Sequence, residues 1–257
     1  MVSSFSHEKS NYHISFFYSL PTPALTPLPS KYTDLLNYVQ RAPDQGDTNA
    51  CLFVASTGAM ELIANKKAGI RNPKPYGEYD LAESYIMHAP NHSYGKTWWE
   101  TKVRKFNWGF GIHIDDWSFE AWTDTWINNN VWNFWNWDGM KKVPLPKVTT
   151  SLLFARGNKY STYVLNKTHI QTVKEAIWKN KAPVMLNYND DGYWHVVLIV
   201  GWNDNVPGEC YQTPSSECNR DLGSFYVRDS MGVEIEVRDF DWLRVKGNAA
   251  ILIKEDI

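Results

Sequence analysis

The spacing of apolar residues along the chain changes from a helical period to a strand period after Pro183. Before that point, apolar positions three and four residues apart predict helices over Cys51–Lys67, Asp80–His88, Ser118–Asn130 and Lys167–Asn180. The first of these helices is expected to bury one face.

After Pro183 the apolar runs are short and rich in β-branched residues, which is typical of strands. Strands are expected over residues 183–188, 194–200 and 249–254. A hairpin is expected to pair residues 224–229 with residues 234–238. Helices followed by strands predict the α+β class, rather than alternating βαβ units.

The main folded unit is expected over residues 28–254, with a helical lobe over about 45–150 and a β-rich lobe over about 151–254. The polar stretch 203–223 carries turn-forming Pro and Gly, so we interpret it as an insertion between two strands. Residues 1–27 lack the apolar core of a signal peptide and run into a proline-rich stretch that breaks helices. We expect them to be a leader or arm outside the fold, or a tail packed on its surface.

Composition narrows the possible functions. The chain is 43% apolar, far above a disordered protein, and no apolar run approaches the roughly 18–20 residues that a membrane helix needs. Its net charge of −2 gives no electrostatic footprint for nucleic acid. We expect a soluble globular monomer without a nucleic-acid or membrane partner, and the sequence indicates no cofactor.

Cys51 is a candidate nucleophile because it follows a turn-forming segment and opens a helix, where backbone N–H groups and the helix dipole stabilise a thiolate. Gln45, six residues upstream, could offer its side-chain amide beside the thiol. With the backbone N–H of Cys51 it would form an oxyanion hole. The alternative is that Cys51 is a small buried apolar residue of an ordinary helix.

His195, at the head of a strand, is a candidate base, and Asp229, at the end of another, could fix its tautomer. The alternatives are a hydrogen-bonded core histidine and an aspartate that caps its own turn. Each signal is weak alone, but the order Gln, Cys, His, Asp makes them reinforce one another.

With these residues the sequence resembles the papain-like cysteine peptidases. Gln45-Gly46 and Cys51 match that family's oxyanion glutamine and nucleophile, and His195–Trp202 resembles its catalytic histidine strand. Cys51 and His195 are 144 residues apart, inside the roughly 130–150 residues expected of such enzymes. Residues 226–232 resemble the segment that carries the family's catalytic Asn. The resemblance implies a two-lobed papain-like fold with the active site between the lobes.

The sequence also departs from that family. Leu52 replaces the usual Trp after the nucleophile, and Thr48 replaces a disulfide cysteine. Asp229 stands for the orienting Asn, and Met231 stands for the Trp that shields it. Without that Trp, we expect water to reach the bond between Asp229 and His195.

The substrate-binding residues are less well marked. The family's Gly-rich substrate stretch is hinted at by Gly109 and Gly111. Trp194, directly before the candidate base, is a further candidate for binding substrate.

The other two cysteines, Cys210 and Cys218, lie eight residues apart inside the insertion. A disulfide between them would tie this segment and imply an oxidising compartment, such as a secreted, periplasmic or lysosome-like location. The alternative is two free thiols.

Nine of the 13 tryptophans fall between Trp98 and Trp137. They could fill the core of the first lobe, or line a cleft for a peptide or sugar. A metal site at His113, Asp115 and Asp116 is disfavoured because the ligands are adjacent in sequence.

These observations favour a cysteine peptidase, an endopeptidase or an exopeptidase, that hydrolyses peptide or protein substrates through a Cys51–His195–Asp229 triad. One alternative is a catalytically weak binding protein that uses the Trp-rich segment. The other is a different acyl transferase, of the transglutaminase-like type, on the same three residues.

Overall fold

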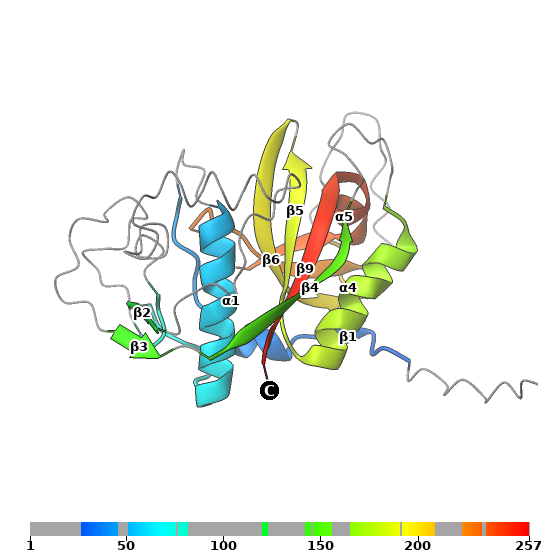
Figure 1. Cartoon of the computed structure of the whole chain (residues 1–257). Helices are drawn as coiled ribbons and strands as arrows, with labels where there is room; N and C mark the ends of the chain where they lie inside the picture. Colours follow the sequence, from blue (N-terminus) through cyan, green and yellow to red (C-terminus); the bar gives the residue numbers. More distant parts are fainter. Residues whose placement is uncertain are drawn as a thin grey trace, which may run out of the picture.

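The structure is a computed structural model, shown in Figure 1. It describes residues 27–45, 51–75, 77–81, 120–122, 142–144, 146–155, 165–190, 192–208, 223–232 and 235–256. Most of the proposed leader, of the Trp-rich segment and of the insertion therefore lies outside the described residues.

The fold is built on a seven-stranded sheet whose order is β4-β9-β5-β6-β7-β8, with β1 paired to β6. All of its pairings are antiparallel, and β2 pairs with β3 in a separate two-stranded sheet. The strands are β1 (Lys31–Tyr32), β2 (Glu120–Trp122), β3 (Lys142–Pro144), β4 (Val148–Ala155), β5 (Val184–Asp190), β6 (Tyr193–Asn203), β7 (Ser224–Arg228), β8 (Glu236–Asp239) and β9 (Gly247–Glu255).

Within the described residues, four helical elements accompany the sheet: the 3-10 helix η1 (Asp34–Tyr38), α1 (Cys51–Ala68), α4 (Lys167–Asn180) and α5 (Phe240–Lys246). Figure 1 shows α1 on one side of the central strands and α4 on the other. Both helices contact β5, β6 and β9. No described helix is long and apolar enough to cross a membrane. The predicted α+β class is confirmed.

The capping residues and apolar spacing of helix α4 lie in its own sequence. Asn166 caps its first turn by accepting from the Thr168 N–H at 3.0 Å, and Lys181 ends it in the left-handed conformation. Its buried apolar residues are spaced as an amphipathic helix requires. The prediction of a helix over Lys167–Asn180 is confirmed.

The helix α1 is buried on every side, rather than on one face as predicted. All residues from Cys51 to Asn65 are buried, including the polar ones. The helix contacts η1, β5, β6 and β9. A helix enclosed in this way must satisfy its polar side chains within the protein.

Other predictions are corrected or lie partly outside the described residues. The helix predicted over Ser118–Asn130 is wrong at β2, where aromatic and small residues pair with β3 in a strand. Asp80 and Leu81 are not helical, and the remainder of Asp80–His88 is outside the described residues. The strand β4 and the helix α5 were not predicted from the pattern. The alternation of apolar and polar residues is weak in β4, because this edge strand carries partly exposed residues of both kinds.

Arg228, the last residue of β7, joins the sheet to α1 through a buried ion pair. Its Nη2 lies 3.1 Å from Oε2 of Glu61, and both side chains are at most 2% exposed. The guanidinium also donates to the carbonyl oxygens of Gln40 and Val54, each at 2.8 Å. A Cβ at Gly58 would lie 2.2 Å from Arg228 Nη1, so the helix needs glycine where the arginine crosses it.

The other oxygen of Glu61 accepts from the Leu81 N–H at 2.9 Å. A carboxylate with partners on both oxygens compensates the buried guanidinium, and these partners offset the cost of taking its own charge out of water. The pair therefore fixes α1 against β7 and the segment that follows Leu81.

Replacing Glu61→Gln is expected to lower the free energy of unfolding by about 3–5 kcal/mol, because it leaves the charge of Arg228 buried without its counter-charge. The matched control is Glu175→Gln, which breaks an exposed i,i+4 pair with Lys179 and is expected to cost less than about 1 kcal/mol. Urea unfolding of the two variants measures the difference. Equal costs would show that the Glu61–Arg228 pair contributes no more than a surface contact.

Candidate active site

The tight hairpin between β5 and β6 positions His195. Gly192 lies in its turn with a φ of +101°, and the Asn189 side chain accepts from the Gly192 N–H at 2.9 Å. This register places His195 directly opposite Tyr188, and the two rings meet edge to face with centroids 5.4 Å apart. The imidazole is thus held in place by the strand pair that carries it.

Asp229 follows the end of β7 and contacts this imidazole. Its Oδ1 lies 2.6 Å from His195 Nε2 and also accepts from the Ser230 N–H at 2.6 Å. The same oxygen of Asp229 thus caps its own turn and holds the histidine, and these are the two roles considered for this residue from the sequence.

Charge and hydrogen bonding settle the protonation of this pair. Burial raises the pKa of Asp229, but the hydrogen bond and charge of His195, the Ser230 N–H and the charge of Arg238 bring it below the ordinary value. An ionised carboxylate can only accept, so His195 Nε2 carries the proton of the shared bond.

Cys51 is the second side chain that acts on this imidazole, whose Nε2 is engaged by Asp229. Burial lowers the pKa of His195, but the hydrogen bonds and charges of Asp229 and Cys51 raise it to about 10. The structure therefore brings Cys51, His195 and Asp229 together, with the histidine charged at neutral pH.

Gln45 is tied to the same turn. Its backbone N–H donates to the Ser230 carbonyl at 2.8 Å, and the Ser230 hydroxyl donates to its side-chain oxygen at 2.5 Å. Because an amide oxygen and nitrogen lie on opposite sides of the same carbon, this bond fixes the direction of the Gln45 NH₂ group. Ser230 thereby links Gln45 to Asp229, a role that the sequence did not indicate.

The chain on either side of these residues is also fastened. Asp44 pairs with Met231 in an isolated antiparallel bridge, and Arg41 donates to the Gly232 carbonyl at 2.7 Å. Gly232 has a φ of +67°, and a Cβ there would lie 2.8 Å from the Asp44 Cβ. A larger residue at this position would push the Gln45 segment away from Asp229.

Two departures from the papain-like pattern have little effect on this geometry. Leu52 is 3% exposed, so that substitution lies in the core. Met231 is 52% exposed, yet Asp229 is only 3% exposed and the His195 side chain 16%. The expectation that water reaches the bond between Asp229 and His195 is therefore wrong.

The remaining site predictions are placed only in part. Trp194 is 42% exposed, directly before His195, and its neighbour Tyr193 is 81% exposed. Gly109, Gly111, Cys210 and Cys218 lie outside the described residues, as does the histidine–aspartate cluster at 113–116. Within the described ranges, no group of three or more His, Cys, Asp or Glu side chains could hold a metal ion.

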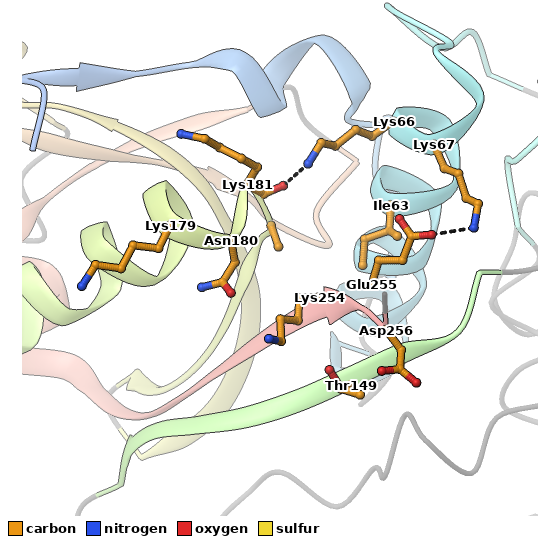
Figure 2. A pocket seen from close by; sticks show the side chains of 11 residues that line it. Ile63, Lys66, Lys67, Thr149, Lys179, Asn180, Lys181, Lys254, Glu255 and Asp256 are labelled. Carbon is orange, nitrogen blue, oxygen red and sulfur yellow. Dashed lines mark hydrogen bonds and ion pairs between the residues drawn. The ribbon is translucent and has the colours of Figure 1, made fainter.

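A cavity of about 410 Å³ lies at the other end of α1. Its walls include five lysines, and Figure 2 shows Lys66 reaching the Lys181 carbonyl and Lys67 reaching Glu255. These lysines neutralise the carbonyl ends of α1 and α4 and nearby carboxylates. Since a helix rises 1.5 Å per residue, Lys66 lies about 22 Å along α1 from Cys51, and this cavity is separate from the candidate active site.

Comparisons with known proteins agree on the fold. No protein-family model matches the sequence, and no curated protein matches it. A solved structure concerning the mite allergens Blo t 1 and Der p 1 is 13% identical, with a TM-score of 0.50, over 91% of this chain and 73% of that one. The fold of this protein is α+β and papain-like.

Two further solved structures match at lower TM-scores. Bromelain from Ananas comosus is 14% identical with a TM-score of 0.46, over 89% of this chain and 100% of that one. The clostridial cysteine protease Cwp84 is 18% identical with a TM-score of 0.43, over 89% of this chain. This chain covers 59% of that Cwp84 structure.

The charge of His195 is expected to persist well above neutral pH and to be lost only near pH 10. Because the folded pKa lies above the ordinary 6.5, the stability that this charge contributes is complete below about pH 6.5 and lost as pH rises through about 10. Asp229→Asn and Cys51→Ala should each move the His195 titration to lower pH, since each removes a negative charge and changes a hydrogen bond.

NMR titration of the His195 ring measures these shifts, with the ring of His169, which lies in the first turn of α4, as an internal reference. If His195 titrates in both variants as in the wild type, Asp229 and Cys51 do not set its charge.

Proposed function

We propose that this protein is a cysteine peptidase that hydrolyses peptide bonds in peptide or protein substrates. The observation that carries the proposal is one imidazole that bonds to Asp229 and whose pKa is raised by Cys51, the first residue of a buried helix. A papain-like fold agrees with it, because it is a scaffold on which such a site is built.

In this proposal Cys51 attacks as a thiolate paired with the His195 imidazolium. The sulfur forms a bond to the scissile carbonyl carbon, and the electrons of the C=O bond move to the oxygen. The N-terminal end of α1 supports the anion on sulfur through the positive end of the helix dipole.

The oxyanion is held by the backbone N–H of Cys51 and the side-chain NH₂ of Gln45. The hydrogen bond between Ser230 and the Gln45 oxygen supports this assignment, since it orients the amide before substrate arrives. A donor fixed in advance needs no reorganisation when charge develops on the oxygen.

His195 then delivers its proton to the leaving nitrogen, the C–N bond breaks, and a thioester to Cys51 remains. Water attacks the thioester carbon while His195 accepts its proton. The C–S bond then breaks, the carboxylic acid product leaves, and the pair of thiolate and imidazolium is restored. Asp229 keeps the ring in one orientation through both proton transfers.

Trp194 and Met231 are proposed to contact substrate, because both are large, apolar and exposed on either side of the catalytic pair in the chain. Gly109 and Gly111 remain proposed substrate-binding residues on the basis of the sequence alone. Apolar surface at an otherwise polar site favours substrates with apolar side chains near the scissile bond.

One equivalent of iodoacetamide or an epoxide reagent is expected to label Cys51 much faster than Cys210 or Cys218, because Cys51 is paired with a charged imidazole. Peptide mapping by mass spectrometry identifies the labelled cysteine. His195→Ala should abolish the preference, and Cys51→Ser should abolish both labelling there and peptide hydrolysis. Equal labelling of all three cysteines, or none at Cys51, would refute the proposal.

Gln45→Ala is expected to lower kcat by about 10²–10³-fold, since it removes one oxyanion donor while leaving the thiolate intact. The rate of Cys51 alkylation should not change, because alkylation forms no oxyanion. A fluorogenic peptide and iodoacetamide, used on the same preparation, measure the two rates. A parallel fall of both rates would mean that Gln45 acts on Cys51 or the fold rather than on the oxyanion.

A further inference from the structure

The orienting residue of this site is a carboxylate, and its second oxygen has its own partner. Oδ1 of Asp229 faces His195, whereas Oδ2 lies 3.5 Å from Nη2 of Arg238. Arg238 lies on β8, which pairs with β7 just before Asp229. The neighbouring strand thus brings a permanent positive charge to the carboxylate.

The guanidinium of Arg238 is held from two sides. Glu236 accepts from its Nε at 2.6 Å, and the ring of Trp242 lies 5.4 Å from its Cζ. The Arg238 side chain is 13% exposed. A guanidinium held by a carboxylate and an aromatic ring keeps one orientation, so its N–H groups point in fixed directions.

Two aromatic contacts connect Trp242 to the histidine. Trp242, on α5, packs edge to face on Tyr188 at 5.0 Å, and Tyr188 packs edge to face on His195 at 5.4 Å. Both aromatic residues are 2% exposed. His195, Asp229, Arg238, Trp242 and Tyr188 therefore form a closed ring of contacts, and the bond between the first two is part of it.

We propose that Arg238 is a positioning residue for the catalytic pair, holding Oδ2 of Asp229 so that Oδ1 stays directed at His195. With Trp242 and Tyr188 it also keeps water from this bond, which the exposed Met231 does not do. The effect of Arg238 on catalysis rests on the proposed peptidase function. Its effect on how Asp229 and His195 are held does not depend on that function.

The charged and titratable groups around this pair come from three elements. Cys51 approaches from α1, Tyr188 from β5, and Glu236 and Arg238 from β8. Of these, Arg238 is the cation that lowers the pKa of Asp229 together with His195. Without it the carboxylate takes up a proton at higher pH, so the acid limb of activity moves to higher pH.

The test compares Arg238→Met, Arg238→Lys and the control Arg244→Met in the full-length protein. Arg244 lies on α5 and pairs with Asp241, so its replacement makes the same change of side chain away from Asp229. The NMR signal of the His195 Nε2 proton reports the bond to Asp229 directly, and pH profiles of kcat report its effect on peptide hydrolysis.

Arg238→Met is expected to move this proton signal toward that of an ordinary imidazole and to speed its exchange with water. It should also lower kcat about tenfold with KM unchanged, and move the acid limb to higher pH. Arg238→Lys should restore part of each effect, because an ammonium can still reach Oδ2. Arg244→Met should behave as the wild type.

A wild-type proton signal and pH profile in Arg238→Met would overturn the proposal, even if its Tm fell, since a purely structural arginine lowers Tm alone. If Arg238→Met does not fold, the same readouts on Arg238→Lys decide, because a wild-type signal and profile there would show that the guanidinium geometry is not needed. If the wild type cleaves no peptide, the peptidase proposal fails. The proton signals still decide whether Arg238 positions the pair.

Discussion

The buried pair of Arg228 and Glu61 is the contact on which the rest of the structure depends. It lies between the helix that begins with Cys51 and the strand that ends beside Asp229, with neither side chain more than 2% exposed. Because both charges are buried, they must lie in contact with each other, and this requirement fixes the alignment of α1 with β7. Cys51 and Asp229 reach the same imidazole because of this alignment.

The short segment 228–232 gathers most of the connections that make the site. Arg228 fixes α1, Asp229 holds His195, and Ser230 orients Gln45. Met231 and Gly232 then fasten the chain that precedes Gln45. Five consecutive residues thus coordinate elements that are far apart in sequence. The departures from the papain-like pattern at 229 and 231 are compensated by Arg238 and the aromatic residues around it.

The sequence was sufficient for features that depend on neighbouring residues. The helix Lys167–Asn180 and the strand that carries His195 follow from local periodicity, and Gln45, Cys51, His195 and Asp229 from motifs with a chemical reason. Burial of α1 on all sides could not be predicted, because it depends on strands more than a hundred residues away. The ring through Arg238, Trp242 and Tyr188 is drawn from β8, α5 and β5, and no spacing along the chain reveals such a meeting.

The separation of Glu61 and Arg228 also determines the order in which this protein can mature. They are 167 residues apart, so during synthesis α1 emerges long before the strand that neutralises its buried carboxylate. Until β7 is made, Glu61 lacks the Arg228 guanidinium that compensates its charge, and α1 cannot take its final buried place. Closing so long a loop is slow, because much chain entropy is lost before the contact forms. Cys51 therefore reaches its final place beside His195 only after the chain is synthesised past residue 228.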